Sequence, residues 1–413
     1  MPFSKFKLSA VITKAIATND FLEPTKIQQE VIPLVLDKHD IIAQAQTGSG
    51  KSASFVIPVL ELFSKISSEG KPRIKVLVLT PTRELTLQVV ETFKNFSQFL
   101  EKKPKVVGVI GGESLGDQMF KIQKGCDVVV ATSGRLLEII AKQQINLSHV
   151  EFFILDEADK MLDLGFAEEL DSILKEIPTK RQNLLFSATY PPKMKLIASK
   201  ITKDPIEIQI EADTPTVQSI KQRAILVNQE NRAPLLRHLL RSEQLGLVLV
   251  FMANKRATDN IAEKFRKHGF LAESFHGNLE QDDRNYTLEE FKAKRIRILF
   301  ATDLVSRGID IDDINTVINF DLPRSPSDYI HRIGRTGRAG KKGKAISFIT
   351  HENSEHFELI EKRAKINLER ENIEGFEFSG ELPNKTKGQA PVKGKGKSKK
   401  DRAREKALEE KKL

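Results

Sequence analysis

The sequence predicts an α/β protein with two tandem domains, each a parallel sheet covered by helices on both faces. Short, continuous apolar runs alternate with segments of helical periodicity, which is typical of doubly covered parallel strands. A polar break at 211–217 (EADTPTV) interrupts this alternation, which then restarts. At about 150 residues per domain, the 413 residues allow two or three domains. We therefore expect domains over 1–210 and 218–374, a linker over 211–217 and a tail over 375–413.

The expected elements follow from two patterns, continuous apolar runs for strands and apolar residues at helical spacing for helices. In the first domain, the apolar runs predict strands over 41–45, 76–80, 106–110, 128–131, 152–155 and 184–186. Helices are expected over 52–63, 84–99 and 166–177, with an N-terminal helix capped by Ser9 and ending near Asn19. In the second domain, strands are expected over 248–251, 271–275, 298–301, 316–320 and 345–349. Its helices are expected over 255–268, 279–292 and 354–365.

Composition narrows the class of protein. Hydrophobic residues make up 39% and charged residues 30%, which indicates a globular chain and excludes collagen-like, mucin-like and wholly disordered ones. A single cysteine, Cys126, excludes an intrachain disulfide and a cysteine-based zinc site. No apolar run approaches the roughly 20 residues of a membrane helix. Lys14 interrupts the apolar residues of the N-terminal segment, which argues against a signal peptide. These features favour a cytoplasmic protein with no membrane partner.

The positive charge is concentrated at the C-terminus. The formal net charge is +10, from 66 basic and 56 acidic residues. Residues 384–413 hold 12 basic and 4 acidic side chains, so the other 383 residues carry 54 basic against 52 acidic. Residues 384–413 include no aromatic side chain for stacking on bases, which leaves phosphate attraction or simple solubilisation as the two interpretations of this basic segment.

A glycine-rich segment between the first strand and a helix predicts a phosphate-binding loop. Its residues are Ala45, Gln46, Thr47, Gly48, Ser49, Gly50, Lys51 and Ser52. The glycines allow backbone N–H groups to turn inward around phosphate oxygens, and the helix N-terminus adds partial positive charge. Lys51 can reach the β- and γ-phosphates, and Ser52 can ligate Mg²⁺. Ala45 stands where the general pattern has glycine.

An acidic segment, Asp156–Glu157–Ala158–Asp159, follows the strand over 152–155. Carboxylates at the carboxyl end of a strand are where open α/β sheets bind ligands. We expect Asp156 to hold Mg²⁺, mostly through water, and Glu157 to orient and deprotonate an attacking water. On its own the segment could equally be a solvated helix start, but the phosphate loop makes that alternative weak.

A second-domain segment, HRIGRTGR, places Arg335 and Arg338 three residues apart. Two guanidinium groups aimed at one point suit the charge that develops on a transferring γ-phosphoryl group. Because these arginines lie on a separate domain, hydrolysis would depend on domain closure. Taken alone, the segment is also compatible with a basic surface helix.

Together these motifs give a specific resemblance. AQTGSGKS, DEAD, Ser187–Ala188–Thr189 and HRIGRTGR occur in the order found in DEAD-box RNA helicases, and the resemblance extends over about 1–370. The short chain with a basic tail further resembles the bacterial RhlE-like group. The resemblance implies two RecA-like domains, ATP and Mg²⁺ as substrate and cofactor, and RNA as partner.

The resemblance also implies the nucleotide contacts. The segment 21–28 (FLEPTKIQ) is similar to the family's adenine-reading motif, in which Phe21 would stack on the base. Gln28 has an amide donor and acceptor that can pair with adenine N6 and N7, and Lys26 belongs to the same segment. Gly308 and Asp310 belong to a segment resembling the motif that couples ATP to RNA, where Asp310 would accept from the ribose hydroxyl.

Expected RNA contacts carry over by the same resemblance. They are Pro81, Thr82, Arg83, Gly111, Gly112, Thr132, Gly134, Arg135, Gly277, Arg284 and Thr302. Ser133 replaces the usual proline in one of these loops. Residues expected to couple the domains are Asp159, Ser187, Thr189, Asp303, Arg307 and His331. Without the resemblance, each would be interpreted as a loop residue or helix cap.

We therefore expect an ATP-dependent RNA helicase that opens short duplexes locally, with little sequence preference because backbone contacts predominate. Two alternatives remain open. One is an ATP-gated RNA clamp that does not unwind, which the presence of Glu157 and both arginines argues against. The other is a translocating DNA helicase, which Gln28 and Asp159 disfavour. Ribosome-assembly or RNA-decay proteins are possible further partners.

Overall fold

The computed structural model of the chain describes residues 2–19, 21–45, 49–65, 71–210, 220–303, 314–337 and 342–380. The first domain runs through seventeen described elements. They are η1 (Phe3–Phe6), α1 (Ala10–Thr18), α2 (Lys26–Leu36), β1 (Ile41–Gln44), α3 (Lys51–Ser64), β2 (Val76–Leu79), α4 (Arg83–Ser97), β3 (Val106–Val109), α5 (Leu115–Gln123), β4 (Val128–Ala131), α6 (Ser133–Ala141), β5 (Phe152–Leu155), α7 (Ala158–Asp163), α8 (Ala167–Leu174), β6 (Gln182–Ser187), α9 (Pro192–Ile201) and β7 (Ile206–Gln209).

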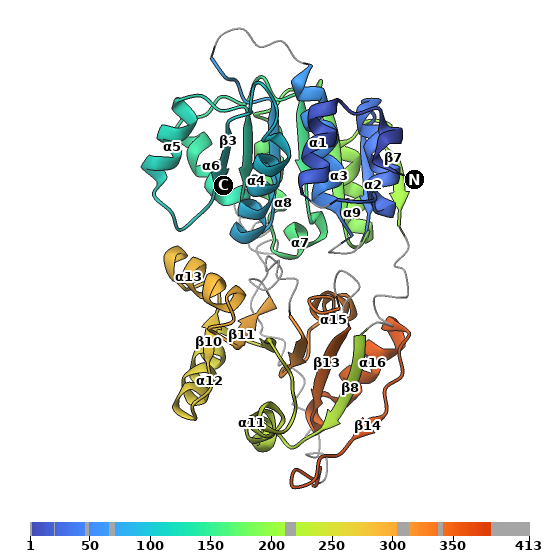
Figure 1. Cartoon of the computed structure of the whole chain (residues 1–413), viewed down its shortest axis with the longest axis vertical. Coiled ribbons are helices and arrows are strands. Elements are labelled where there is room, and N and C mark those ends of the chain that lie inside the picture. Colours follow the sequence, from blue (N-terminus) through green and yellow to red (C-terminus); the bar gives the residue numbers. More distant parts are fainter. Residues whose placement is uncertain are drawn as a thin grey trace, which may run out of the picture. The chain divides into compact units, whose positions relative to one another are not determined.

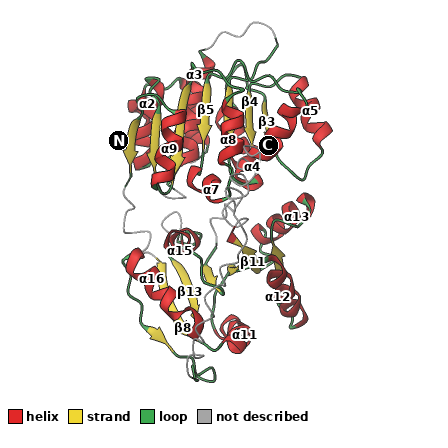
Figure 2. Ribbon diagram, turned by 180° about the vertical axis from the view of Figure 1, so that it is seen from behind, coloured by secondary structure: helices red, strands yellow, loops and turns green. Residues whose placement is uncertain are grey.

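The strands of the first domain form one parallel sheet in the order β3-β4-β2-β5-β6-β1-β7. Alternate residues of each strand enter two different cores, as Val76 and Val78 do on one face and Leu77 and Leu79 on the other. Helices α1–α4 cover the first face and α5–α9 cover the second (Figures 1 and 2). Because both faces are buried, the strands are apolar throughout, as the sequence predicts.

The second domain repeats this plan. Its described elements are β8 (Ile220–Leu226), η2 (Gln229–Asn231), α11 (Arg232–Ser242), β9 (Val248–Met252), α12 (Lys255–Lys267), β10 (Ala272–Phe275), α13 (Gln281–Lys292), β11 (Ile298–Thr302), β12 (Thr316–Asn319), α15 (Pro326–Ile333), β13 (Gly343–Ile349), η3 (His351–Asn353), α16 (Ser354–Ala364) and β14 (Arg370–Glu371). The parallel sheet has the order β10-β11-β9-β12-β13-β8-β14. Helices α11 and α12 pack on one face, whereas α13, α15 and α16 pack on the other.

The predicted fold class and every predicted strand are confirmed, but three strands were not expected. Strand β7 lies at a sheet edge and buries only Ile208, so its sequence lacks a continuous apolar run. Strand β8 carries the polar run Lys221–Gln222–Arg223, and β14 has two residues. The expected linker over 211–217 lies outside the described residues. No helix in the described part of the chain is long and apolar enough to cross a membrane.

The structure differs from two expectations about the ends of the chain. Ser9 is the N-cap residue of α1 by position, but its hydroxyl donates to Glu61 Oε2 at 2.7 Å rather than capping the helix. At the other end, two aromatic residues expected in the tail pack on the second domain. Phe376 lies against His238, and Phe378 stacks on His351 with ring centroids 3.9 Å apart.

We expect Cys126 to resist thiol reagents in the folded protein. The side chain is 1% exposed in the core of the first domain, and burial raises the pKa of its thiol to about 12. The thiolate, which is the reactive form, is therefore absent at pH 8.5, whereas an unfolded chain ionises there. Because the thiol ionises at lower pH in the unfolded chain than in the folded one, its contribution to the free energy of unfolding is lost as the pH rises from about 9 towards 12. Alkylation by iodoacetamide at pH 8.5, followed by mass, should be slow in buffer and rapid in denaturant. Equal rates in both would contradict the prediction.

Candidate active site

The phosphate loop is built on the end of β1 and the start of α3. Gly50 is the N-cap residue of α3, with φ +92°. Lys51, the first helical residue, is 7% exposed, and its Nζ donates to the carbonyl oxygen of Ala45 at 2.8 Å. The amine therefore points back across the loop towards the end of the strand. Gln46, Thr47 and Gly48 lie outside the described residues, and the side chain of Ser52 is half-buried beside Lys51.

Gln28 ties the expected adenine-reading segment to this loop. Its Oε1 accepts from the backbone N–H of Thr25 at 3.0 Å, which is half of the capping box that starts α2. Its Nε2 donates to the carbonyl oxygen of Gly50 at 3.2 Å, and the side chain is fully buried. Both amide atoms expected to read adenine thus already have partners within the chain. Each atom keeps capacity for a second hydrogen bond, since the amide nitrogen carries two hydrogens and the oxygen two lone pairs. Adenine recognition by Gln28 remains a prediction. Phe21 packs edge-on against Phe96, and Lys26 is exposed.

We expect Gly50→Ala to weaken ATP binding by at least about tenfold. A Cβ at this position would lie 2.6 Å from Gln28 Nε2 and 2.9 Å from Thr25 Oγ1, in a backbone conformation that L residues rarely adopt. The start of α3 would have to shift away from the phosphates. Gly165→Ala is the matched control, since Gly165 has φ +85° but open space around its missing Cβ. Binding titration of a fluorescent ATP analogue checks this, and equal affinity of the two variants would contradict it.

The acidic segment follows β5 and enters α7. Asp156 is 2% exposed and its Oδ1 accepts from the N–H of Glu157 at 2.8 Å. Glu157 is the N-cap residue of α7 and has the left-handed φ of +51°, a strained conformation for a residue with a side chain. Its carboxylate pairs with the buried amine of Lys160 at 2.5 Å. The other carboxylate oxygen, Oε2, is buried and accepts no hydrogen bond from the described residues. Glu157 therefore offers one uncommitted oxygen.

Burial and neighbouring charges pull the pKa values of this segment in opposite directions. Burial raises the pKa of Asp156 to about 6, although the ammonium of Lys51 opposes the rise. Burial would also raise the pKa of Glu157, but Lys160, Lys51 and Arg335 outweigh it and hold that pKa below its usual value. Burial lowers the pKa of Lys160 to about 8. Separated pKa values of this kind are typical of catalytic groups. Glu157 is accordingly ionised and able to accept a proton.

Asp159 is fixed by residues from the end of β6. Its Oδ2 accepts from both the N–H and the hydroxyl of Thr189, at 3.0 and 2.9 Å. Its own N–H donates to Ser187 Oγ at 3.3 Å, and that hydroxyl donates to the carbonyl of Thr189 at 2.6 Å. Ser187 and Thr189 therefore hold the end of the acidic segment. That they also reach the second domain remains a prediction.

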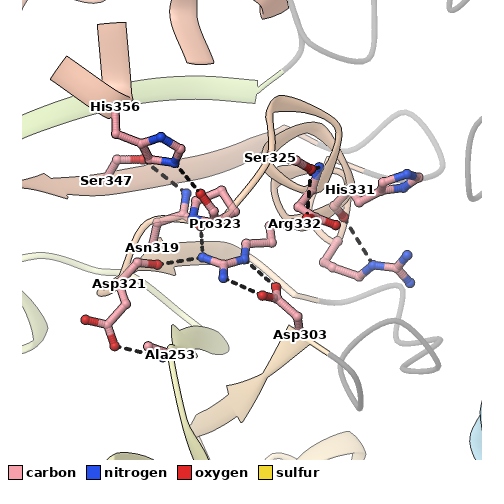
Figure 3. A network of polar contacts seen from close by, with 12 residues as sticks. Ala253, Asp303, Asn319, Asp321, Pro323, Ser325, His331, Arg332, Ser347 and His356 are labelled. Carbon is pink, nitrogen blue, oxygen red and sulfur yellow. Dashed lines mark hydrogen bonds and ion pairs between the residues drawn. The ribbon is translucent and has the colours of Figure 1, made fainter. Parts of the chain in front are cut away.

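In the second domain, an arginine without an assigned role in the sequence analysis organises the polar contacts. Arg332, 3% exposed, pairs with Asp303 through two contacts, Nε to Oδ1 at 2.5 Å and Nη2 to Oδ2 at 2.7 Å (Figure 3). Its Nη1 donates to Asn319 Oδ1 at 3.1 Å and to the carbonyl of Asp321 at 2.6 Å. The guanidinium also lies 4.7 Å from the ring centroid of Phe251. Arg332 thus joins α15 to the ends of β11 and β12.

The remaining predicted second-domain residues are only partly described. Arg335 is 5% exposed, its Nε donates to the carbonyl of His331 at 3.4 Å, and its charge acts on both Glu157 and Lys160. His331 lies on α15 and is half-buried. The predictions for Arg307, Gly308, Asp310 and Arg338 lie outside the described residues.

The expected RNA contacts of the first domain gather at one edge of its sheet. Strands β2, β3 and β4 are neighbours, and their carboxyl ends lead into the three predicted segments. These segments contain Pro81, Thr82, Arg83, Gly111, Gly112, Thr132, Gly134 and Arg135. Thr82 caps α4 by accepting from the N–H of Leu85 at 3.3 Å. Arg83 lies over Gly111, where an added Cβ would be 3.3 Å from its Nη2. Arg135 Nη1 donates to the carbonyl of Glu113 at 2.9 Å.

The second-domain contacts are arranged in the same way. Gly277 follows β10 and Thr302 ends β11, and these strands are neighbours in the sheet. Arg284, on α13, forms a buried ion pair with Glu84 of the first domain. Beside it, Arg83 Nη1 donates to Gln281 Oε1 at 3.3 Å. Two residues predicted to touch RNA are thereby also engaged across the two domains, and their RNA contacts remain predictions.

A predicted phosphate loop, an ionised carboxylate with an uncommitted oxygen and an arginine from a second α/β domain are typical of two-domain nucleotide-dependent enzymes. Residues 25–197 match the DEAD/DEAH box helicase family, and 231–340 match the helicase conserved C-terminal domain. The chain is 42% identical over 371 residues to a probable ATP-dependent RNA helicase of Methanocaldococcus jannaschii, covering 90% of this chain and 98% of the relative. The chain belongs to the family of DEAD-box ATP-dependent RNA helicases.

Other relatives and solved structures agree with this assignment. The chain is 41% identical to the Bacillus subtilis DEAD-box ATP-dependent RNA helicase CshA, over 89% of this chain and 73% of the relative. Yeast (S. cerevisiae) Dbp5 bound to RNA and ADP BeF3 superposes with a TM-score of 0.81 at 30% identity, over 90% of this chain and 95% of that chain. Mss116p bound to single-stranded RNA and AMP-PNP gives 0.80 at 26% identity, over 90% and 78%. The RhlE-like subgroup remains a prediction.

Proposed function

We propose that this helicase hydrolyses ATP when RNA is bound and uses the cycle to open short RNA duplexes. One observation carries the proposal. Glu157, the expected general base, is ionised and presents a free buried oxygen, and the charge acting on it includes that of Arg335 from the second domain. A base on one domain and a cation on the other make hydrolysis depend on both domains. We further propose that the protein acts in the cytoplasm.

The phosphates would be held at the start of α3. The N–H groups at the helix start and the ammonium of Lys51 face the same loop, so Lys51 would exchange the carbonyl of Ala45 for phosphate oxygens. Gln28 and Phe21 would contact the adenine. Arg335, with Arg338, would stabilise the charge that develops on the γ-phosphoryl group.

The donor atoms fit Mg²⁺. In the residues that the structure describes, no group of three or more His, Cys, Asp or Glu could hold a metal ion. Mg²⁺ commonly binds through one or two protein oxygens together with substrate phosphates and water. Ser52 and the buried carboxylate of Asp156 provide such oxygens, and the positive charge of the ion would favour ionised Asp156. When bound, Mg²⁺ would neutralise phosphate charge.

Proton transfer would take place at Glu157. Lys160 holds Oε1, which leaves Oε2 to accept a proton from the attacking water. Asp159, held by Ser187 and Thr189, would fix the start of α7 during this step. We propose that Arg332 and Asp303 transmit RNA binding at the end of β11 to Arg335, three residues further along the chain and just beyond α15.

We expect strong stimulation of ATP hydrolysis by single-stranded RNA and little by single-stranded DNA of the same sequence. RNA is distinguished by its 2′-hydroxyl groups, whereas the phosphate contacts are common to both. Steady-state phosphate release checks this, and separation of a short RNA duplex is the second readout. Equal stimulation by DNA would contradict the RNA assignment. ATP-dependent RNA binding without strand separation would favour the clamp alternative.

A further inference from the structure

A pocket of about 920 Å³ lies at the edge of the second-domain sheet where the strands begin. Its walls are the residues that precede or open β8 to β13 and the residues that follow α11. Two of the three residues predicted to touch RNA in this domain, Gly277 and Thr302, follow or end their strands at the opposite edge, and the third, Arg284, lies on α13. The pocket is therefore separate from the motif residues that hold RNA in our proposal.

Four cationic side chains line this pocket: Lys221, Arg297, Lys342 and Lys344. We call them the basic edge. Lys221, Arg297 and Lys342 are exposed, and Lys344 is half-buried. The acidic lining residue, Glu243, is already paired with Arg223 at 2.8 Å. Within the described ranges, no ion pair involves any side chain of the basic edge, so its charge is available to a ligand.

The register of the sheet places two of these cations side by side, and the other two lie at the starts of strands on the same edge of the sheet. Lys344 lies opposite Lys221 on the adjacent strand, and Thr316 opposite Lys344. Arg297 immediately precedes β11, which is separated from β13 by β9 and β12. At about 4.8 Å between neighbouring strands, the basic edge extends over about 19 Å from β11 to β8. A small anion needs converging donors, whereas cations spread over this distance suit successive phosphates along an extended strand.

The local balance of charge remains positive. Helices α11 and α12 end near the pocket, at Ser242 and Lys267, and each helix end carries about half a negative charge. Their combined charge of about −1 is small beside the four whole charges of the basic edge. Residues 1–383 as a whole are nearly neutral, with 54 basic and 52 acidic side chains. A concave surface with four unpaired cations is therefore unlike the average surface of this protein.

The available donors suit a backbone rather than a shaped anion site. The N–H groups of Arg297, Thr316 and Lys344 already donate to neighbouring carbonyls, at 2.9, 3.1 and 3.0 Å. Specific anion sites generally use such amides, so at these three positions only the side chains are left to bind an anion. Leu271 in the same pocket is 57% exposed and Phe270 is half-buried, which gives riboses and bases an apolar surface.

We propose that the basic edge binds the phosphate backbone of a second RNA segment, distinct from the strand held by the motif residues. The choice of RNA as ligand rests on the proposed function. Such a site would let the enzyme stay attached to a long RNA through its second domain while the motif residues act on a short duplex nearby.

The test compares two full-length variants that each lose four positive charges. One is Lys221→Gln, Arg297→Gln, Lys342→Gln, Lys344→Gln. The control is Lys175→Gln, Lys180→Gln, Lys193→Gln, Lys195→Gln, which removes exposed lysines of the first domain. Binding is measured over a range of salt concentrations with a 10-nucleotide and a 40-nucleotide single-stranded RNA. ATPase stimulation by the short RNA is measured in parallel.

We expect the basic-edge variant to bind the long RNA at least about tenfold more weakly than the control variant does. Its slope of log affinity against log salt should be smaller by about 2 to 3, since each lost phosphate contact removes about 0.7 for a single strand. ATPase stimulation by the short RNA should be unchanged. Identical behaviour of the two variants with long RNA would overturn the proposal. Binding of a polyglutamate peptide is measured as well. If the basic-edge variant alone lost this binding and kept its RNA affinity, the result would overturn the proposal in favour of an acidic protein partner. A wild-type protein that no RNA stimulates would instead contradict the proposed function.

Discussion

Replacing Glu157 with Gln is expected to reduce RNA-stimulated ATP hydrolysis by about 10²- to 10⁴-fold, the usual contribution of a general base. The amide keeps the size of the side chain but cannot take the proton at Oε2. ATP and RNA binding should persist, because Lys51 and the phosphate loop are unchanged. The variant also leaves the amine of Lys160 buried without its carboxylate, so the pKa of Lys160 should fall below its present value of about 8.

A matched control separates the catalytic effect from the loss of any buried carboxylate. Glu61 is 2% exposed and pairs with Lys65 at 2.9 Å, far along α3 from the phosphate loop. Glu61→Gln should therefore keep most of the ATPase rate. Single-turnover phosphate release with saturating RNA is the measurement. If Glu157→Gln retained more than a tenth of the wild-type rate, Glu157 would not be the base.

The second large effect is expected from Arg332→Met, which should destabilise the second domain by about 3 kcal/mol, since it removes a buried guanidinium that makes charged and neutral hydrogen bonds to three residues. Asp303, Asn319 and the carbonyl of Asp321 would all lose a donor. ATPase activity should fall as well, because Arg335 lies two residues beyond the end of α15. Urea unfolding and RNA-stimulated ATPase are the two measurements.

Arg295→Met is the control for this substitution. Arg295 also makes two contacts to one carboxylate, that of Glu290, at 2.8 and 2.6 Å, but its side chain is 64% exposed. Exposed pairs of this kind usually contribute little to stability. A cost for Arg332→Met no greater than that for Arg295→Met would show that the network in Figure 3 adds little stability.

Features that depend on neighbouring residues in the sequence can be predicted from it. Strands buried on both faces, such as β5 with its run of Phe and Leu, are identified because a short, uninterrupted apolar run between turn residues is typical of them. Strand β8 was missed because Lys221, Gln222 and Arg223 interrupt its apolar pattern. The phosphate loop and the acidic segment were located because their chemistry is local in the sequence.

Contacts between distant segments could not be derived in this way. Arg332 meets Asp303 across 29 residues, and Arg284 meets Glu84 across 200. A buried arginine almost always has a partner. The place of Arg332 within the HRIGRTGR segment only weakly indicates that it is buried and paired. Which residue it pairs with depends on the fold. The same holds for Gln28, whose capping partner is three residues away but whose contact with Gly50 spans 22.

The contact between Gln28 and Gly50 has a thermodynamic consequence for the nucleotide. One amide group joins the segment predicted to read adenine to the first turn of the helix predicted to bind phosphates, so binding of one half of the ligand would alter the free energy of binding the other half. Adenosine and triphosphate, offered as separate fragments, should therefore bind cooperatively or competitively rather than independently. In such a site, the identity of the base would change the affinity for the phosphates.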